Sequence, residues 1–329
     1  INVIEIQGGY ANELRDQRAL LIDELSEIVP TEVSEVPITD TNHPDEPTGA
    51  NYYTVKIGGQ VLVDTYNYET LECKARDYKV NQTDAAGLYD IKWSKTGNTF
   101  NAGGSSMSGT LKALFDIRDG NNGENFSGLA KVLNSTEVQI TNPSITSIVG
   151  VSMPEEGILT INGREYAYEG FTFEQDADGN ITSYTFNMKR ALTAEEQARV
   201  DGRTASVGTS IDAMGIPYYM SQMNQFLRSF ATEFNNILKK GVDLDGNSTS
   251  GYAFFTGTDT VTGKEFSFDG KDANGNTVNG SGSDTYYKLT AANICVNSMI
   301  VKDPTKLATT VDINGKGGVD AYDLVEELA

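Results

Sequence analysis

The sequence predicts an α+β fold, in which a discontinuous helical bundle domain carries β-rich domains inserted as excursions. Two segments, 10–28 and 216–238, repeat apolar residues every three or four positions, as amphipathic helices do. The long stretch between them consists of short apolar runs separated by Gly, Asn and Asp, which is typical of strands and turns. Amphipathic helices are only marginally stable alone, so the two distant segments are expected to pack together.

The first helix ends before Pro30, because proline lacks a backbone donor and restricts the residue before it. A second, short helix is predicted over 105–117, where two glycines and two serines offer a start signal. The apolar face of the first helix, interrupted by Arg18, consists of Leu14, Leu21, Leu25 and Ile28.

The long helix over 216–238 carries the strongest apolar stripe. Full burial of one Phe or Leu contributes about 1.5–3 kcal/mol, so this face is expected to be buried against the other helices. Phe230→Asp is then expected to unfold the bundle, because it places a charge in an apolar seam. The stripe consists of Ile216, Met220, Met223, Phe226, Leu227, Phe230, Phe234, Ile237 and Leu238.

Turn chemistry identifies the clearest hairpins. Gly58-Gly59 joins two apolar runs, and Asn162-Gly163 joins two more, since Asn-Gly readily adopts the positive dihedrals of a type I′ turn. Thr193 to Glu196 resembles a capping box that opens a short helix. After the long helix, strands are expected over 252–256 and 264–268, followed by a mobile surface loop over 269–284.

These elements predict three domains in a chain of 329 residues. The chain begins at Ile1 rather than Met and its last residues resemble the first turns of a helix, so a fragment of a longer protein is expected. The predicted division is a bundle domain of 1–29, 104–119, 216–240 and 319–329, a β-rich domain of 30–103 and 241–318, and an inserted β-rich domain of 120–215.

Composition argues against two classes of partner. A net charge of −21 repels nucleic-acid phosphate and anionic membrane surfaces. No apolar run is long enough to span a bilayer. The sequence therefore predicts neither a nucleic-acid partner nor a membrane partner.

No set of residues for catalysis or for metal binding is evident. The loops Asp176–Asn180 and Asp243–Asn247 lack the glycine and glutamate positions of an EF-hand, and turn chemistry explains them. His43, the single histidine, lies in a proline-containing loop, which suits a catalytic base poorly. Gly103–Gly109 lacks the Gly-Lys-Ser/Thr ending of a phosphate loop and reads as a helix start. We predict no catalytic, cofactor-binding or metal-binding residue, no cofactor, and no enzyme activity.

The two cysteines lie in strand-like runs. Two cysteines with one histidine do not make a zinc site. Buried free thiols are expected at Cys73 and Cys295, and a disulfide between them stays open as the alternative.

Several strings resemble the flagellar hook-associated protein 1 family, which forms the first junction between hook and filament. Residues 9–26 contain Ala-Asn-Glu-Leu-Arg-Asp-Gln-Arg and Asp-Glu-Leu-Ser, and residues 108–119 contain Gly-Thr-Leu-Lys-Ala-Leu-Phe-Asp-Ile-Arg-Asp, as that family does. The segment 216–235, from Ile-Pro to Phe-Asn, is similar to a third motif. Further similar segments follow in the same order at 241–247, 254–256 and 289–294.

The resemblance implies a non-enzymatic protein that is exported without a cleaved signal, is extracellular and forms a ring on the hook. Its implied partners are the hook protein, the second hook–filament junction protein, identical neighbouring subunits and a flagellar export chaperone. The family's terminal coiled-coil regions are absent here, and they are expected to complete the bundle. The insert over 121–215 departs from the family pattern and is expected to be an outward decoration without a role in assembly.

Two other readings stay open. A secreted carbohydrate-binding adhesin or glycoside hydrolase would use the strand-rich blocks, the 46 acidic residues and the tyrosines. Flagellin or another axial flagellar protein would share the helical construction from distant parts of the chain.

Overall fold

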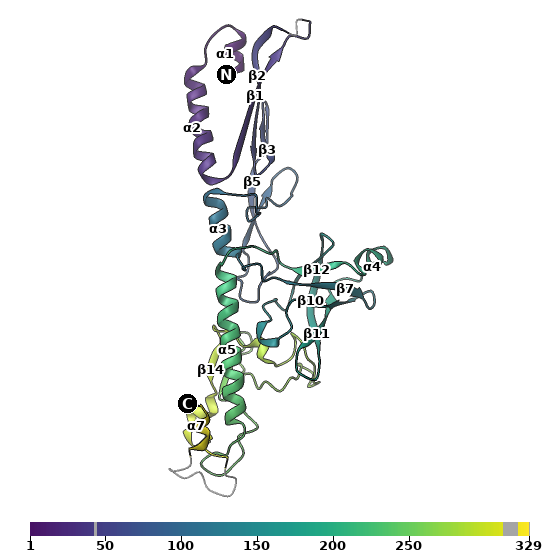
Figure 1. Ribbon diagram of the computed structural model, residues 1–329, viewed down its shortest axis with the longest axis vertical. Helices are drawn as coiled ribbons and strands as arrows, with labels where there is room; N and C mark the ends of the chain where they lie inside the picture. The colour runs from purple at the N-terminus through teal and green to yellow at the C-terminus, as the bar shows by residue number, and fades with distance from the viewer. Residues whose placement is uncertain (43–44, 312–321, 329) are drawn as a thin grey trace. The chain divides into compact units, whose positions relative to one another are not determined.

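The structure is a computed structural model that describes residues 1–42, 45–311 and 322–328. Its contacts divide the chain into two compact units, which are described one at a time. Both contain helices and antiparallel strands, so the α+β class is confirmed (Figure 1). The first unit comprises 1–77, 85–124 and 210–217, and the second comprises 78–84, 125–209 and 218–329. The predicted three-domain division uses other boundaries and stays a prediction.

The first unit contains the helices α1 (Asn2–Ile6), α2 (Asn12–Ile28) and α3 (Gly109–Asp119). The helix predicted to end before Pro30 does so, whereas the short helix begins at Gly109 instead of residue 105. Gly109 has a φ of +85°, and a Cβ there would lie 2.7 Å from the carbonyl oxygen of Ile28. The chain therefore turns tightly against the end of α2, and α3 begins only after that turn.

A four-stranded antiparallel sheet lies beside α2, and the first unit also contains a separate two-stranded sheet (Figure 1). The hairpin predicted around Gly58-Gly59 is confirmed, with positive φ at both glycines. Trp93, the single tryptophan of the chain, lies in the core. The strands are β1 (Thr31–Thr39), β2 (Pro47–Ile57), β3 (Gln60–Asp64) and β4 (Asn67–Tyr68), and β5 (Leu71–Ala75) pairs separately with β6 (Tyr89–Trp93).

The segment where the chain leaves the first unit pairs with the segment where it returns. Asn121 and Met214 form a β-bridge, and the N–H of Asn122 donates to the carbonyl of Ala213 at 2.9 Å. The side-chain oxygen of Asn121 also accepts the N–H of Ile211 at 2.9 Å. This pairing closes the excursion at its base.

A closed barrel dominates the second unit, and aromatic side chains fill it. The ring of Phe186 packs against Tyr168 edge-to-face at 4.8 Å between centroids and against Phe126 at 5.6 Å. The Asn162-Gly163 turn is confirmed by positive φ at both residues. The strands, in order around the barrel, are β10 (Arg164–Gln175), β11 (Ile181–Met188), β8 (Glu137–Thr141), β7 (Phe126–Val132), β12 (Thr204–Val207) and β9 (Gly157–Ile161).

The capping box predicted at Thr193 is present and opens the helix α4 (Ala194–Val200). The Thr193 hydroxyl accepts the N–H of Glu196 at 3.2 Å, and the Glu196 carboxylate accepts the N–H of Thr193 at 2.9 Å. The hydrogen bonds from Arg190 and from the Thr193 backbone lower the pKa of Glu196 to about 2. The Glu196 carboxylate of the capping box therefore stays ionised well into the acid range.

The remainder of the second unit departs from the predicted strands. The strand expected over 252–256 is reduced to β13 (Phe255–Gly257), and the one over 264–268 is wrong, since only an isolated bridge forms there. The prediction of a mobile surface loop is also wrong for its last part, because Ser281 and Ser283 are buried and the Ser281 hydroxyl accepts the N–H of Phe171 in the barrel. Other elements are α5 (Ile216–Leu238), β14 (Ile294–Val296), α6 (Ser298–Lys302), α7 (Asp323–Leu328) and the 3₁₀ turns at Ile148–Gly150, Tyr286–Lys288 and Pro304–Lys306.

The long helix α5 has the predicted bounds but an unexpected orientation. Its apolar stripe was expected to be buried, yet Phe226 is 73% exposed, Met223 51% and Phe230 46%. The prediction that this face is buried is wrong for Ile216, Met223, Phe226 and Phe230, whereas Phe234, Ile237 and Leu238 at its end pack in a hydrophobic cluster as expected. The buried side instead follows steps of four and three along the helix and is largely polar: Asn224, Arg228, Ala231, Asn235 and Leu238.

Polar partners explain this orientation. The amide oxygen of Asn235 accepts the N–H groups of Phe254 and Phe255, both at 2.9 Å. The side chain of Asn224 accepts the N–H of Ala291 at 2.9 Å. Because these partly buried backbone donors need acceptors, the polar side of α5 faces inward.

The bundle predicted from four separate segments is tested only in part. In the first unit α2 meets α3, and in the second unit Leu324 of α7 packs with Leu238 and Ala308. Residues 319–321 and 329 of the predicted fourth segment lie outside the described residues. The assembled bundle stays a prediction.

Two further expectations concern single residues. The two cysteines are free, but Cys73 is exposed and Cys295 only partly buried, so the expectation of two buried thiols is wrong. Cys73 is exposed because its two-stranded sheet, β5 with β6, leaves every residue of β5 at the surface. His43 lies outside the described residues.

The inverted orientation of α5 makes a testable prediction. Ala231→Asp should lower the free energy of unfolding by about 3 kcal/mol or more, because it buries a charge without a partner. Phe230→Asp should cost only about 1 kcal/mol, because that ring is half exposed. Denaturant unfolding followed by circular dichroism measures both; equal destabilisation by the two variants would contradict the orientation.

Candidate functional site: apolar contact surfaces

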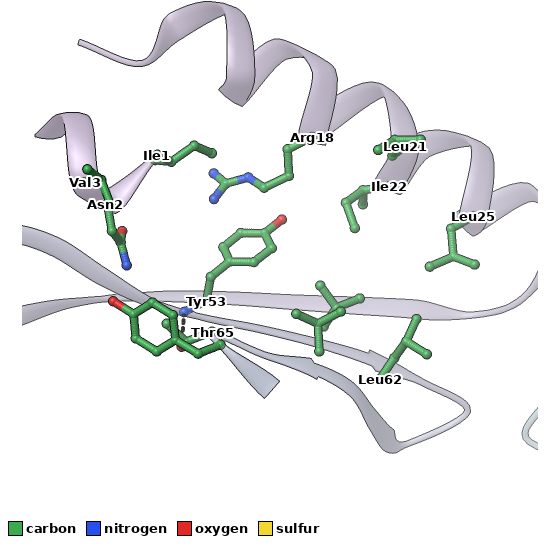
Figure 2. Close-up of a pocket in the computed structure, with 13 residues that line it drawn as sticks. Ile1, Asn2, Val3, Arg18, Leu21, Ile22, Leu25, Tyr53, Leu62 and Thr65 are labelled. Carbon is green, nitrogen blue, oxygen red and sulfur yellow. Dashed lines mark hydrogen bonds between the residues drawn. The ribbon is translucent and has the colours of Figure 1, made fainter. Parts of the chain in front are cut away.

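An apolar groove lies between α2 and the sheet of the first unit, with a volume of about 490 Å³ (Figure 2). Side chains of α2 form one wall, and side chains of β2 and β3 form the other. The start of α1 lies at one end. The lining residues are Ile1, Asn2, Val3, Arg18, Leu21, Ile22, Leu25, Tyr53, Val55, Leu62, Val63, Thr65 and Tyr66.

Arg18, which interrupts the apolar stripe of α2 in the sequence, makes both a cation–π contact and an ion pair. Its guanidinium lies 3.7 Å from the centroid of the Tyr53 ring, and it forms an ion pair with Glu35 at 2.9 Å. Figure 2 shows the guanidinium above that ring, with Leu21 and Ile22 further along the helix. The charge is therefore held at the edge of an otherwise apolar wall.

A polar latch holds α1 beside this groove. Both carboxylate oxygens of Glu5 accept hydrogen bonds from Arg15 at 2.7 Å, and Arg15 also reaches Glu35 at 3.1 Å. Asn2 and Asn51 exchange two hydrogen bonds at 2.9 and 3.1 Å. The hydrogen bond from Arg15 lowers the pKa of Glu5, and the same pairing raises the pKa of Arg15. The latch thus depends on an ionised Glu5.

An uncovered apolar face on α5, which we call the α5 stripe, consists of Tyr219, Met223, Phe226 and Phe230. The steps between them are four, three and four, which is the spacing of the contact seam in a left-handed coiled coil. The rings of Phe226 and Phe230 stack with centroids 6.1 Å apart. A helix with matching spacing could pack along this stripe with side chains interlocking.

The helices of the first unit carry similar exposed residues. Leu14, Leu21 and Ile28 are seven residues apart on α2, and all three are exposed. On α3, Leu114 and Ile117 are exposed as well. Exposed apolar residues that lie together often mark a contact site, so these residues of α2 and α3 form a candidate contact surface.

Within the described residues, nothing has the geometry of a metal site, because no group of three His, Cys, Asp or Glu could hold an ion. Asp176 and Asp243 each accept backbone N–H groups of their own loops, which closes a turn. The Gly103–Gly109 segment runs into the turn before α3. None of the helices in the described ranges is long and apolar enough to cross a membrane.

The comparison with protein families decides the identity of the first part of the chain. Residues 1–142 match the family model described as the flagellar hook-associated protein FlgK helical domain. The chain carries a domain of the FlgK family. The match includes α1, α2, α3 and the sheet around them, and ends after the first two barrel strands. A search of curated proteins found no match.

The FlgK family gives the chain a structural role in the flagellum. The FlgK family belongs to the extracellular, filament-associated structure of the flagellum, and a domain of this family implies interaction with other flagellar components. The resemblance to the hook-associated family, based on the Asp-Gln-Arg and Arg-Asp motifs, is therefore confirmed. These motifs lie on α2 and α3, the helices with exposed apolar residues.

Sequence reasoning missed the groove. Its sheet wall depends on Tyr53 and Val55 alternating along β2, with Leu62 on the neighbouring strand. The alternation is visible in the sequence, but which side of the hairpin α2 covers is not. Arg228 was missed as well, although it is one of only two charged residues in α5, the other being Glu233.

The latch predicts a pH dependence in the first unit. The pKa of Glu5 is lower in the folded chain than its ordinary value of 4.5, so the latch is fully formed above that pH and is lost as the pH falls further. Acidification should release α1, seen as shifts of the Asn2 and Asn51 amide resonances by NMR. Glu5→Gln should show released α1 at all pH values; an unshifted acid spectrum of the wild type would contradict the latch.

Proposed function

We propose that this protein is a junction protein that joins the flagellar hook to the filament by self-assembly into a ring. The FlgK domain supports a hook-associated role. The observation that carries the proposal is the α5 stripe, because its coiled-coil spacing fits contact with further helices. The exposed residues of α2 and α3 provide additional helix-contact surface in the first unit.

In this proposal, the α5 stripe and the exposed apolar residues of α2 and α3 pack against the terminal helices of the axial domain that the family resemblance implies. A buried aromatic side chain contributes about 1.5–3 kcal/mol, so covering two phenylalanines and their neighbours stabilises an assembled rod substantially. The groove beside α2 offers a second apolar surface for the same purpose. The protein acts by contact alone and is not an enzyme.

The proposed partners are the hook protein, the second hook–filament junction protein, identical subunits in the ring and a flagellar export chaperone. Export proceeds without a cleaved signal through the flagellar secretion apparatus. The net charge of −21 is consistent with the absence of nucleic-acid and membrane partners in this proposal.

The proposal is tested by complementation with the full-length gene in a strain that lacks the junction protein. Met223→Ser, Phe226→Ser and Phe230→Ser combined should give cells that make hooks but shed filament monomers, because the contact seam is lost. The purified triple variant should melt within a few degrees of the wild type, since Phe226 is largely exposed and Met223 and Phe230 are about half exposed.

A matched control changes exposed polar residues of the same helix: Gln222→Ala, Ser229→Ala and Glu233→Ala. This control should restore attached filaments. Attached filaments and normal motility in the Ser triple variant would contradict the assembly role of the α5 stripe. Antibody labelling confined to the distal end of the hook would separate a junction protein from flagellin.

A further inference from the structure

Among the described residues of the second unit, Arg228 is a fully buried cation whose hydrogen bonds go to neutral oxygens and not to a carboxylate. Arg228 of α5 is 1% exposed, and each of its guanidinium nitrogens donates to a neutral oxygen. The side chain makes five hydrogen bonds between 2.6 and 3.1 Å, which matches its five N–H donors. The acceptors are the carbonyls of Leu289, Val149, Val151 and Tyr287 and the side-chain oxygen of Gln82.

These acceptors come from three segments that are far apart in the sequence. Val149 and Val151 lie in the connection between the barrel strands β8 and β9. Tyr287 and Leu289 follow α5 by some fifty residues of chain, and Gln82 belongs to the short segment 78–84. Arg228 is therefore a single point at which α5, the barrel and two other segments meet, all within the second unit.

The barrel core reaches the same point. The ring of Tyr287 packs edge-to-face on Phe171 of β10 at 5.5 Å, and its hydroxyl donates to the carbonyl of Met153 at 2.9 Å. Its own carbonyl accepts a hydrogen bond from Arg228. The segment that follows α5 thus contributes a core side chain to the barrel and an acceptor to the arginine.

A buried charge is tolerated only where every donor is satisfied. Burial lowers the pKa of Arg228 to about 10, so the guanidinium remains charged at neutral pH. If any one segment moved away, charged N–H groups would lie unpaired in the interior. The cost of that state opposes separate opening of the barrel and the helix.

We propose that Arg228 is a clamp that makes α5 and the barrel one cooperative folding unit, so that the barrel is carried as a rigid extension of α5. This role is separate from the assembly contacts of the α5 stripe, which lies on the exposed side of the helix. It also changes the expectation for the insert. Deleting 121–215 removes the acceptors at Val149 and Val151, so the deletion destabilises the second unit even if the insert has no role in assembly.

Native-state hydrogen exchange of the whole chain tests the clamp. Protection is followed separately in β8, in β11 and in residues 224–238 of α5 as denaturant rises. In the wild type these three regions should lose protection together. Arg228→Lys keeps the charge but has too few donors, so protection should fall about tenfold or more, with the barrel and α5 opening at different denaturant concentrations.

Two controls sharpen the result. Arg190→Lys changes an exposed arginine of the same unit and should leave protection unchanged. The fluorescence of Trp93, the single tryptophan, reports on the first unit alone and should be unaffected by Arg228→Lys. Separate opening of the barrel and α5 in the wild type, or protection within twofold of wild type in Arg228→Lys, would overturn the clamp.

If Arg228→Lys abolishes all protection in the second unit, Gln82→Ala decides the question. That variant removes one acceptor of Arg228 and one donor to the Tyr287 carbonyl. Lower protection with β8 and β11 opening at a different denaturant concentration from α5 supports the clamp. Protection equal to that of the wild type overturns it.

Discussion

The second unit depends on the complete hydrogen bonding of one buried guanidinium. Arg228 is hydrogen-bonded to neutral oxygens and to no carboxylate of the described residues, so its burial is tolerated only because oxygens from several chain segments converge on it. That requirement determines which side of α5 faces inward. It also brings residues 287–289 to the barrel, where Tyr287 completes the aromatic core.

Because the polar side of α5 faces inward, its aromatic side faces the solvent. In an isolated globular domain this would be an unfavourable arrangement, because Phe226 and Phe230 stay in water. In a structural protein of the flagellum the same arrangement is useful. The helix makes its buried contacts through hydrogen bonds of Asn224, Arg228 and Asn235 and through apolar packing at its end, and under the proposed function the exposed α5 stripe serves contacts made on assembly.

The first unit shows a similar division between polar and apolar contacts. Ion pairs among Glu5, Arg15 and Glu35 hold α1 and α2 on the sheet, while the groove between helix and sheet remains open. Exposed leucines on α2 and α3 extend the apolar surface. The FlgK family match lies over these elements, which connects this surface chemistry with a flagellar structural role.

The sequence alone determined the local elements and the family. The bounds of α5, the end of α2, the Asn162-Gly163 turn and the Thr193 capping box follow from interactions between residues close in the chain, so they could be predicted. The α+β class was predicted for the same reason, whereas the hook-associated motifs were identified by their resemblance to a known family. Only the tertiary structure decided which side of α5 is buried, that the barrel shares its core with residues after α5, and that a groove opens beside α2. Those features depend on hydrogen bonds and packing between residues such as Arg228, Val151 and Tyr287, whose meeting no local pattern reveals.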